Sequence, residues 1–496
     1  MHDTSRRWLA AALALACCLS MATPLVAASN GTNASGTAQN ATDAGAAQNA
    51  TPNPCAGTIT APANGTTVIS VQGFRFGEQG GKRPAKLVGV GPRGQVEWVH
   101  QNGERYDVVW GYDVDPMDNG NLFITATVKG HQTLVYEFDP ETQERVWSKT
   151  FDEADTHDAD LINNGTEILV ANMRNYNESA DRNDDRLFVY NRTTDEITWE
   201  WRFADHYDPG NLEENYTDDW THVNDVDKIG EGLYLASPRN FDQAVVVNRS
   251  TNEIVMKLGE DGKTDILNEQ HNPDYLESEN GTPTLLVGDS ENDRIVEYAN
   301  PDGDLTDGTG WNRTWTLTGD LAWPRDADRL PSGNTLVSDS SNHRVLEVTP
   351  EGEVVWEFYA PWLVYDAARL PAGEHGGPTM TDLNATGTHE VHGDADIHQN
   401  ATRLEACHEL LANVSGLADG GATAGETTDG ASAGETTERA MEDGTTESDA
   451  GETDDEQAEP AGAHTEVPGF GPLEGVAGLL GSLALLFVGI GVSRRR

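Results

Sequence analysis

The stretch that decides the fold is RDADRLPSGNTLVSDSSNHRVLEVTPEGEVVWEF, residues 325–358. It opens on an Asp-flanked segment and continues with the short apolar runs TLVSD, RVLEVT and VVWEF, which turns separate. Short alternating runs bounded by Gly, Asn, Asp and Pro are typical of antiparallel strands. The stretch therefore predicts one four-stranded blade of a β-propeller.

The same order of elements recurs along the chain. Further openings begin at Tyr112, His157, Asn224 and His271, and with Arg325 they lie 45, 67, 47 and 54 residues apart. This spacing is typical of propeller blades rather than of helical solenoids. The sequence therefore predicts five complete blades.

A sixth blade is divided between the two ends of the repeat. YDAARLPAGE, from Tyr365, copies an opening strand without its followers, whereas residues 64–73 and 85–101 copy the other three strands without an opening. Together the fragments complete one blade and leave no exposed edge in the ring. We predict an all-β fold, a six-bladed β-propeller over residues 61–372, closed by N- and C-terminal segments that share one blade. An open sandwich or two separate domains would leave this complementarity unexplained.

Four cysteines are present, and two of them, Cys17 and Cys18, fall in an apolar N-terminal segment. The other two, Cys55 and Cys407, flank the predicted closure. In an oxidising compartment two lone cysteines most simply form a disulfide. We therefore predict a Cys55–Cys407 bridge at the seam of the ring.

Both ends of the chain resemble targeting signals. Residues 1–28 combine Arg6 and Arg7 with an apolar run and small residues, which predicts a secretory signal and resembles a twin-arginine signal. Residues 467–496 hold PGF, an apolar run long enough for one bilayer and three arginines. This end resembles the archaeosortase sorting signal, in which a lipid replaces the helix; a plain membrane helix is the alternative. We expect an exported, cell-surface protein anchored at its C-terminus.

The remaining segments are polar or acidic. We expect a low-complexity segment over residues 29–60, an irregular His-containing extension over 373–415 and a disordered acidic stalk over 416–466. A formal charge of −51 excludes a nucleic-acid surface, which needs a basic footprint, and is typical of a halophile, whose medium screens self-repulsion. Asn-x-Ser/Thr acceptor sequences from Asn30 to Asn413 predict glycans.

Histidines and arginines recur at two places in each blade. Because two antiparallel strand lengths return the chain to its start, the opening and the turn between the second and third strands share one face. The openings supply His157, His222, His271 and Arg325, and the turns supply His131, Arg174, Arg239, Arg294, His343 and Arg344. The repeat therefore predicts a cationic mouth inside an acidic shell, where a small anion would bind.

Other repeated residues have structural explanations. The Asp pairs of the openings fit hydrogen-bond acceptors between blades, although they leave a channel calcium ion as an alternative. Arg294 and Arg344 fit ion pairs with neighbouring carboxylates. The histidines from His375 to His408 match no metal-ligand spacing, so we expect no metal site there and no cofactor. Trp220 and Trp323, beside His222 and Arg325, are candidates for an aryl pocket.

One family combines these features. WTHVNDVDKIGEGLYLASPRN (220–240), QHNPDYL (270–276) and LLVGDSENDRIVEY (285–298) resemble the arylsulfate sulfotransferases, which are secreted six-bladed propellers. The resemblance covers most of residues 60–370. It implies that a histidine takes a sulfuryl group from a phenolic sulfate and passes it to an acceptor phenol without a nucleotide. Carried over, it marks His222 and His271, with Arg239 and Arg294 as donors to the sulfuryl oxygens.

One departure leaves the nucleophile open. The family pattern expects its nucleophilic histidine on the blade after the QH pair, where this chain has Arg325, and His343 is the only later candidate. The predicted catalytic residues are His222, His271 and His343, and the predicted substrate-binding residues are Arg239, Arg294, Arg325, His157, Trp220 and Trp323. A non-catalytic surface propeller that binds a small anion or a protein partner is the rival interpretation, and a calcium-dependent hydrolase is a third. The oligomeric state does not follow from the sequence.

Overall fold

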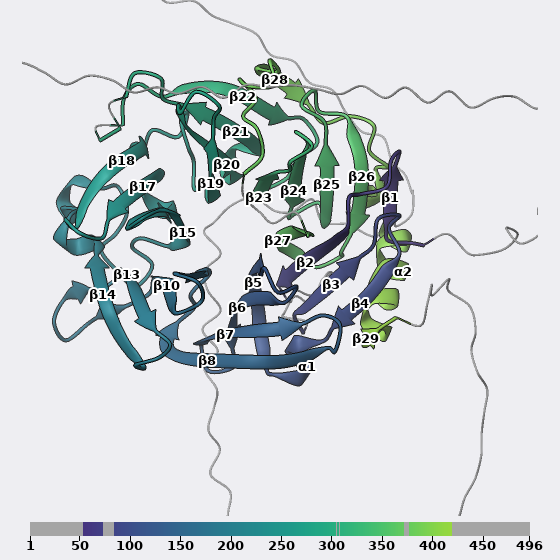
Figure 1. Ribbon diagram of the computed structural model, residues 1–496, viewed down its shortest axis with the longest axis horizontal. Helices are drawn as coiled ribbons and strands as arrows, with labels where there is room; N and C mark the ends of the chain where they lie inside the picture. Colours follow the sequence, from purple (N-terminus) through teal and green to yellow (C-terminus); the bar gives the residue numbers. More distant parts are fainter. Residues whose placement is uncertain (1–52, 73–83, 304, 307, 372–375, 419–496) are drawn as a thin grey trace, which may run out of the picture. The chain divides into compact units, whose positions relative to one another are not determined.

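The computed structural model describes residues 53–72, 84–371 except 304 and 307, and 376–418. Within this part, six mainly antiparallel sheets are arranged as blades around a common centre (Figure 1). The all-β fold and the six-bladed propeller predicted from the sequence are confirmed. The expected signal peptide, most of the acidic stalk and the C-terminal sorting signal lie outside the described residues.

Three blades are built from continuous stretches of chain and have four strands each. From the channel outward they contain β5 (Val108–Pro116), β6 (Leu122–Val128), β7 (Gln132–Asp139) and β8 (Glu144–Ala154); β9 (Ala159–Ile162), β10 (Glu167–Asn172), β13 (Arg186–Asn191) and β14 (Glu196–Arg202); and β15 (Val223–Gly230), β16 (Leu233–Pro238), β17 (Gln243–Asn248) and β18 (Glu253–Gly259).

The other three blades each gain a fifth, outer strand. They contain β19 (His271–Glu277), β20 (Pro283–Asp289), β21 (Arg294–Ala299), β22 (Asn312–Thr318) and β28 (Gly387–Glu390); β23 (Pro324–Arg329), β24 (Thr335–Asp339), β25 (Arg344–Val348), β26 (Val354–Tyr359) and β1 (Ala56–Ile59); and β27 (Leu363–Leu370), β2 (Thr66–Gln72), β3 (Lys86–Val90), β4 (Val96–His100) and β29 (Gly416–Leu417).

Short elements lie between and beside the blades. They are the two-stranded ribbon of β11 (Tyr176–Asn177) and β12 (Arg182–Asn183), the helices α1 (Asn102–Arg105) and α2 (Ala401–Asn413), and the 3₁₀ helices η1 (Phe203–Asp205), η2 (Pro209–Asn211), η3 (Arg239–Phe241), η4 (Ser290–Asn292) and η5 (Ile397–Gln399).

The divided blade closes the ring as predicted. β27 pairs antiparallel with β2, with Leu370 opposite Thr66 and Ala367 opposite Ile69, and β2 continues into β3 and β4. The pairing register shifts between Ser70 and Val71, beside Tyr365. The inner strand of this blade therefore comes from the C-terminal side and its outer strands from the N-terminal side.

The two flanking segments differ from what we expect. β1 lies inside residues 29–60, and it pairs with β26, so the ordered part begins earlier than 61. The expected irregular extension contains α2, on which Leu404, Cys407 and Leu411 repeat at helical spacing and join a core cluster. Its apolar positions stand among many polar residues, and their periodicity was too weak to separate from a loop.

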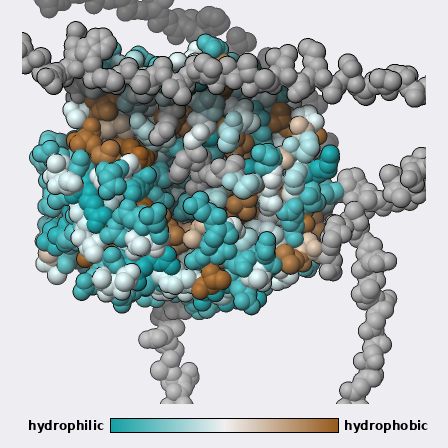
Figure 2. Space-filling model, in the orientation of Figure 1, coloured by the Kyte–Doolittle hydropathy of each residue, from teal (hydrophilic) through white to brown (hydrophobic). Residues whose placement is uncertain are grey.

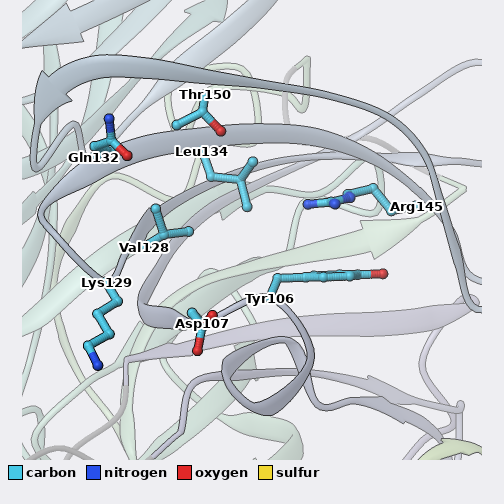
Figure 3. A pocket seen from close by; sticks show the side chains of 8 residues that line it. All are labelled: Tyr106, Asp107, Val128, Lys129, Gln132, Leu134, Arg145 and Thr150. Carbon is cyan, nitrogen blue, oxygen red and sulfur yellow. The ribbon is translucent and has the colours of Figure 1, made fainter. Parts of the chain in front are cut away.

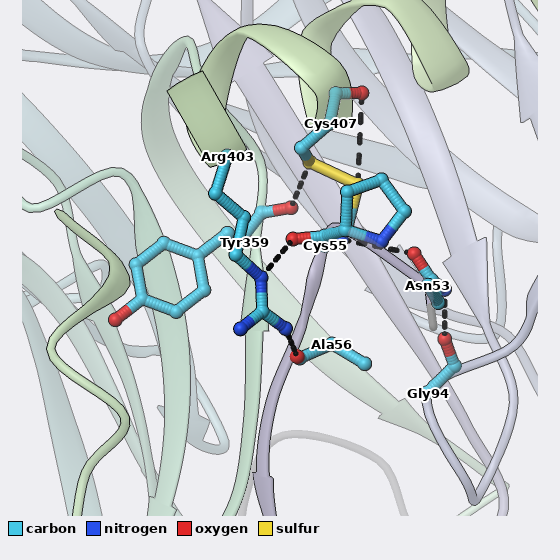
Figure 4. The surroundings of a disulfide bond; sticks show 8 residues. Asn53, Cys55, Ala56, Gly94, Tyr359, Arg403 and Cys407 are labelled. Carbon is cyan, nitrogen blue, oxygen red and sulfur yellow. Dashed lines mark hydrogen bonds between the residues drawn. A yellow bond between two sulfur atoms is a disulfide. The ribbon is translucent and has the colours of Figure 1, made fainter. Parts of the chain in front are cut away.

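A disulfide joins Cys55 to Cys407, which lie 352 residues apart (Figure 4). Arg403 of α2 reinforces the bridge, because its guanidinium donates to the carbonyl oxygens of Pro54 and Ala56 at 3.1 and 2.6 Å. The predicted pairing is therefore present, and it fastens α2 and β1 to the blade next to the seam.

The surface is mostly polar, as the composition requires. The face seen in Figure 2 is largely hydrophilic, with hydrophobic residues in small separate groups. Among the described residues the exposed large hydrophobic side chains are Val146, Ile197 and Leu417. No helix of the described part is long and apolar enough to span a membrane.

Replacing Cys407 with serine should destabilise the propeller, because the unfolded chain regains the freedom that a very long closed loop removes. The chain-entropy model gives a loss of about 3–5 kcal/mol in the free energy of unfolding. Guanidinium unfolding of the oxidised wild type and the variant would measure it. Equal midpoints would show that the bridge adds nothing to the closure made by β27 and β2.

Candidate active site

Each blade places one side chain on its inner strand, or in the loop directly before that strand, and an Asp or Asn follows it in the sequence. We call these six residues the central ring: Tyr112, His157, Asn224, His271, Arg325 and Tyr365. All but Asn224 carry an aromatic, imidazole or guanidinium group, and all six are at least nine-tenths buried. The register of the propeller therefore gathers residues that are far apart in the sequence.

Tyr365 lies at the centre of this ring and contacts the other five members. Its ring centroid lies 5.1 Å from that of Tyr112, 5.6 Å from that of His157 and 6.3 Å from that of His271. The Arg325 guanidinium lies 5.1 Å from the same centroid, and the Tyr365 hydroxyl donates to the Asn224 carbonyl oxygen at 3.2 Å. Burial raises the pKa of Tyr365 well above its ordinary value, so the phenol keeps its proton.

The aspartates that follow the ring tie neighbouring blades together. Asp158 accepts from the Val226 amide at 2.6 Å, Asp160 from the Lys228 amide at 2.9 Å, and Asp366 from the Val114 amide at 2.8 Å. These bonds agree with the predicted acceptors between blades. The alternative of a calcium ion in the channel stays a prediction.

These carboxyl groups are buried close to one another, and that keeps protons on them. Burial, followed by repulsion from neighbouring aspartates, raises the pKa of Asp113, Asp158 and Asp326 well above the ordinary value. Burial also raises the pKa of Asp366 to about 7. The channel next to the central ring is therefore less negative than its composition suggests.

His271, the first residue of β19, is held in one tautomer. Its Nδ1 lies 2.8 Å from Ser290 Oγ, and that hydroxyl donates to the Pro324 carbonyl oxygen at 2.8 Å. Because the serine hydrogen is used, Oγ must accept from Nδ1–H. Nε2 of His271 therefore keeps a lone pair.

His222 lies in the loop before β15 and has a charged partner instead. Its Nδ1 lies 2.9 Å from Asp219 Oδ1, and its ring centroid lies 5.1 Å from that of His157. The backbone at His222 has φ of 41°, a left-handed conformation that costs a non-glycine residue about 1–2 kcal/mol. Such strain persists where the surroundings fix it, and it is frequent at functional sites.

The three histidines are neutral at pH 7. Burial lowers the pKa of His157, His222 and His271 well below the ordinary value, and neighbouring positive charges lower it further. Neutral imidazoles are nucleophiles and bases, whereas imidazolium ions are neither. The mouth therefore holds three imidazoles that are ready to accept a proton or an electrophile.

Two of the predicted arginines lie at this mouth. Arg239 pairs with Glu269, and its charge lowers the pKa of His222 and His271. Arg325 donates to Gln72 at 2.8 Å and stacks over the Trp323 ring at 4.0 Å. Both positive charges therefore act on the histidines.

The two candidate tryptophans have different surroundings. Trp323 lines the mouth, since its ring meets His271 edge-on at 5.9 Å. Trp220 is fully buried and packs against Tyr216 and Phe241. Trp220 therefore belongs to the hydrophobic core, and its place in an aryl pocket is not supported.

Two other predicted residues have hydrogen-bond partners outside the central ring. Nδ1 of His343 lies 2.8 Å from the Trp362 carbonyl oxygen. Burial, helped by the nearby His398, lowers the pKa of His343 to about 4. Arg294 donates to Asp289 at 2.6 Å and to the Asp265 and Ile266 carbonyl oxygens. The ring residues are not among these partners. The structure thus gives Arg294 the ion pair with a neighbouring carboxylate that the sequence suggested as its alternative. Arg325 and Arg239 lower the pKa of His271, whereas His398 is the neighbour whose charge lowers the pKa of His343.

Sequence reasoning missed four residues of the site. They are Tyr112 and Tyr365, and the carboxylates Asp155 and Asp219. The tyrosines could have been found, because each precedes an Asp at a blade opening, as His157 and Arg325 do. Asp155 and Asp219 lie in loops outside the repeat and gave no such signal.

Two further places collect polar side chains without the mouth histidines. Asp320, Asp394, Asp396 and His398 gather near Arg344, which forms ion pairs with Asp394, Asp339 and Glu357. A groove in the blade of β5 to β8 is lined by Tyr106, Asp107, Val128, Lys129, Gln132, Leu134, Arg145 and Thr150 (Figure 3). Neither of these two sets of residues includes Arg239 or Arg325.

Comparison with known proteins agrees with this geometry. Residues 70–297, a little under half of the chain, match the family model described as Arylsulfotransferase (ASST). The matched range includes His157, His222, His271 and Arg239, and it ends before Arg325 and Tyr365. No curated protein matches the chain in sequence.

Solved structures resemble the chain only in fold. A Bacteroides caccae protein of unknown function is 11% identical, with 61% of this chain and 98% of that chain covered and a TM-score of 0.42. The β-propeller domain of Myceliophteria thermophila Cps50 (Swd1) is 13% identical over 64% and 92%, with a TM-score of 0.35. A virginiamycin B lyase from Staphylococcus aureus is 11% identical over 54% and 73%, with a TM-score of 0.32.

The buried neutral histidines should make the propeller less stable in mild acid. Below the unfolded-state pKa of about 6.5 only the unfolded chain protonates them, so stability falls as the pH falls. His157→Gln should remove one such group and recover up to about 2 kcal/mol of the loss between pH 7 and pH 5. Urea unfolding at both pH values would measure this, and an unchanged difference would mean that His157 protonates in the folded protein.

Proposed function

We propose that the chain is a nucleotide-independent aryl sulfotransferase that moves a sulfuryl group from a phenolic sulfate to an acceptor phenol through a histidine intermediate. The observation that carries the proposal is His271, with its Nε2 lone pair fixed by Ser290 and with Arg325 and Arg239 close enough to lower its pKa. A neutral imidazole beside two guanidinium groups suits attack on an anionic sulfur centre.

Unsatisfied donors at the mouth support an anionic substrate. Nε of Arg239 and Nε1 of Trp323 are buried and find no hydrogen-bond partner in the described part of the chain. Buried donors without partners are costly, and functional sites are where they are retained. Sulfuryl oxygens would accept from such groups.

The first half-reaction balances on these residues. Nε2 of His271 attacks sulfur, the bond between sulfur and the aryl oxygen breaks, and the phenolate leaves with the electron pair. A proton from His222 converts it to phenol. The negative sulfate raises the pKa of the neighbouring His222 on binding, so His222 takes up this proton as the substrate binds.

The second half-reaction reverses these steps. The acceptor phenol gives its proton to His222, and its oxygen attacks the sulfur on His271. The bond between sulfur and nitrogen breaks, and His271 returns to its neutral Nδ1–H tautomer. The charge is conserved, because the proton lost by the acceptor replaces the one given to the leaving phenolate.

We also propose that the protein is exported and acts at the surface of a halophilic cell. The terminal signals and the acidic composition support this location. The Cys55–Cys407 bridge fits an oxidising compartment. Exposed Asn177, Asn280 and Asn413 begin acceptor sequences and are among the expected glycan sites.

Intact mass spectrometry tests the transfer mechanism. After brief exposure to a nitrophenyl sulfate, the purified chain should gain the mass of one sulfuryl group, because the intermediate is covalent. His271→Gln should lose the adduct and at least about 1,000-fold in phenol release. His343→Gln is the matched control, and it should keep both.

The contrary results separate the alternatives. Adduct formation that survives His271→Gln but not His343→Gln would identify His343 as the nucleophile. Neither adduct nor phenol release with several aryl sulfates would leave a propeller that binds a small anion or a partner without catalysis.

A further inference from the structure

Asp219 is a carboxylate that contacts a mouth histidine, His222, directly. Its Oδ1 lies 2.9 Å from His222 Nδ1, and the same oxygen lies 3.3 Å from Arg174 Nη2. Asn240 of η3 donates to the backbone carbonyl oxygen of Asp219 at 2.6 Å and fixes the loop from the other side. Asp219 is therefore held in place from two elements.

These contacts belong to a closed circuit of side chains. The Tyr112 hydroxyl donates to Asp155 at 2.5 Å, Asp155 lies 3.4 Å from Arg174, and Arg174 reaches Asp219. The circuit returns through His222 and His157 to Tyr112, since the His157 ring lies 5.1 Å from His222 and 4.1 Å from Tyr112. Three blades are thereby linked around His222.

The partners of the two Nδ1 atoms differ in charge. His271 donates to the neutral Ser290 hydroxyl, whereas His222 meets a carboxylate. A carboxylate stabilises the imidazolium form that arises when Nε2 takes a proton, and a hydroxyl does so much less. The environments therefore favour proton transfer at His222 and nucleophilic attack at His271.

We propose that Asp219 is a positioning residue, which holds His222 as the Nδ1–H tautomer and makes its Nε2 the proton-transfer atom of the site. The proposal rests on the aryl sulfotransferase function argued above. It goes further by assigning the proton to one histidine and by naming the carboxylate that controls it.

The charges around His222 decide whether its pKa rises or falls when the Asp219 charge is removed. Burial opposes protonation of His222 most strongly. The positive charges of Arg239, Arg174 and Arg325 oppose it further. The Asp219 carboxylate lies against His222 Nδ1 and favours its protonation, and the neighbouring His157 is neutral. Removing the Asp219 charge should therefore lower the pKa of His222 in the sulfate complex, so that a smaller fraction of His222 carries the proton that the leaving phenolate needs.

The test compares leaving groups in Asp219→Asn. A nitrophenolate leaves without a proton, whereas an unsubstituted phenolate, with a pKa of about 10, needs one. The variant should lose about 100-fold in kcat/KM with phenyl sulfate and less than about 5-fold with a nitrophenyl sulfate, as expected for a lost general acid. The exposed neighbour Asp218→Asn should leave both rates unchanged.

A purely structural role would give a different pattern. Equal losses with both sulfates would overturn the proposal, and so would wild-type rates with both. Folding of each variant is checked by its thermal unfolding, and Asp219→Glu should restore part of the phenyl sulfate rate because it returns the charge.

A second measurement decides the proposal if no aryl sulfate is turned over at all. The imidazole nitrogen shifts of His222, read by NMR on the full chain labelled at histidine, should show the Nδ1–H tautomer in wild type and a mixed tautomer in Asp219→Asn. The same spectrum for both would overturn the positioning role. Absence of turnover with the expected shifts would instead contradict the sulfotransferase function alone.

Discussion

The pairing of β27 with β2 is the interaction on which the rest of the structure depends. It joins residues about 300 positions apart in the sequence, since Leu370 lies opposite Thr66, and it converts five blades and two fragments into a closed ring. The same strand carries Tyr365, which contacts every other member of the central ring. Strand β27 therefore forms both the seam of the fold and the centre of the site. The disulfide and α2 secure the adjacent blade, which contains β26 and β1.

The chemistry of the site follows from burial at this centre. Closing the ring removes water from imidazoles, guanidinium groups and carboxyl groups at once, so their charges are set by one another rather than by solvent. The aspartates of the channel retain protons and bind the next blade, while the histidines lose theirs. Arginines keep their charge, and this combination of guanidinium groups and neutral imidazoles supports the proposed binding of an anionic substrate.

Much of this arrangement follows from the sequence. The repeat spacing and the complementary fragments at Tyr365 and Asn64 predict six blades, and the register of the openings brings His157, His271 and Arg325 to one mouth. The roles of individual side chains depend on loops that obey no repeat. Trp220 turned inward because Tyr216 and Phe241 enclose it, and His343 pairs with the backbone at Trp362. Asp219 acts through a contact that only the folded loop creates.

Rapid-mixing kinetics would show whether the mouth passes a sulfuryl group through a covalent histidine. With a nitrophenyl sulfate and no acceptor phenol, we expect a burst of about one nitrophenol per chain, after which release stops until an acceptor is added. Steady release from the first turnover without an acceptor, or a burst that no phenol can discharge, would contradict it.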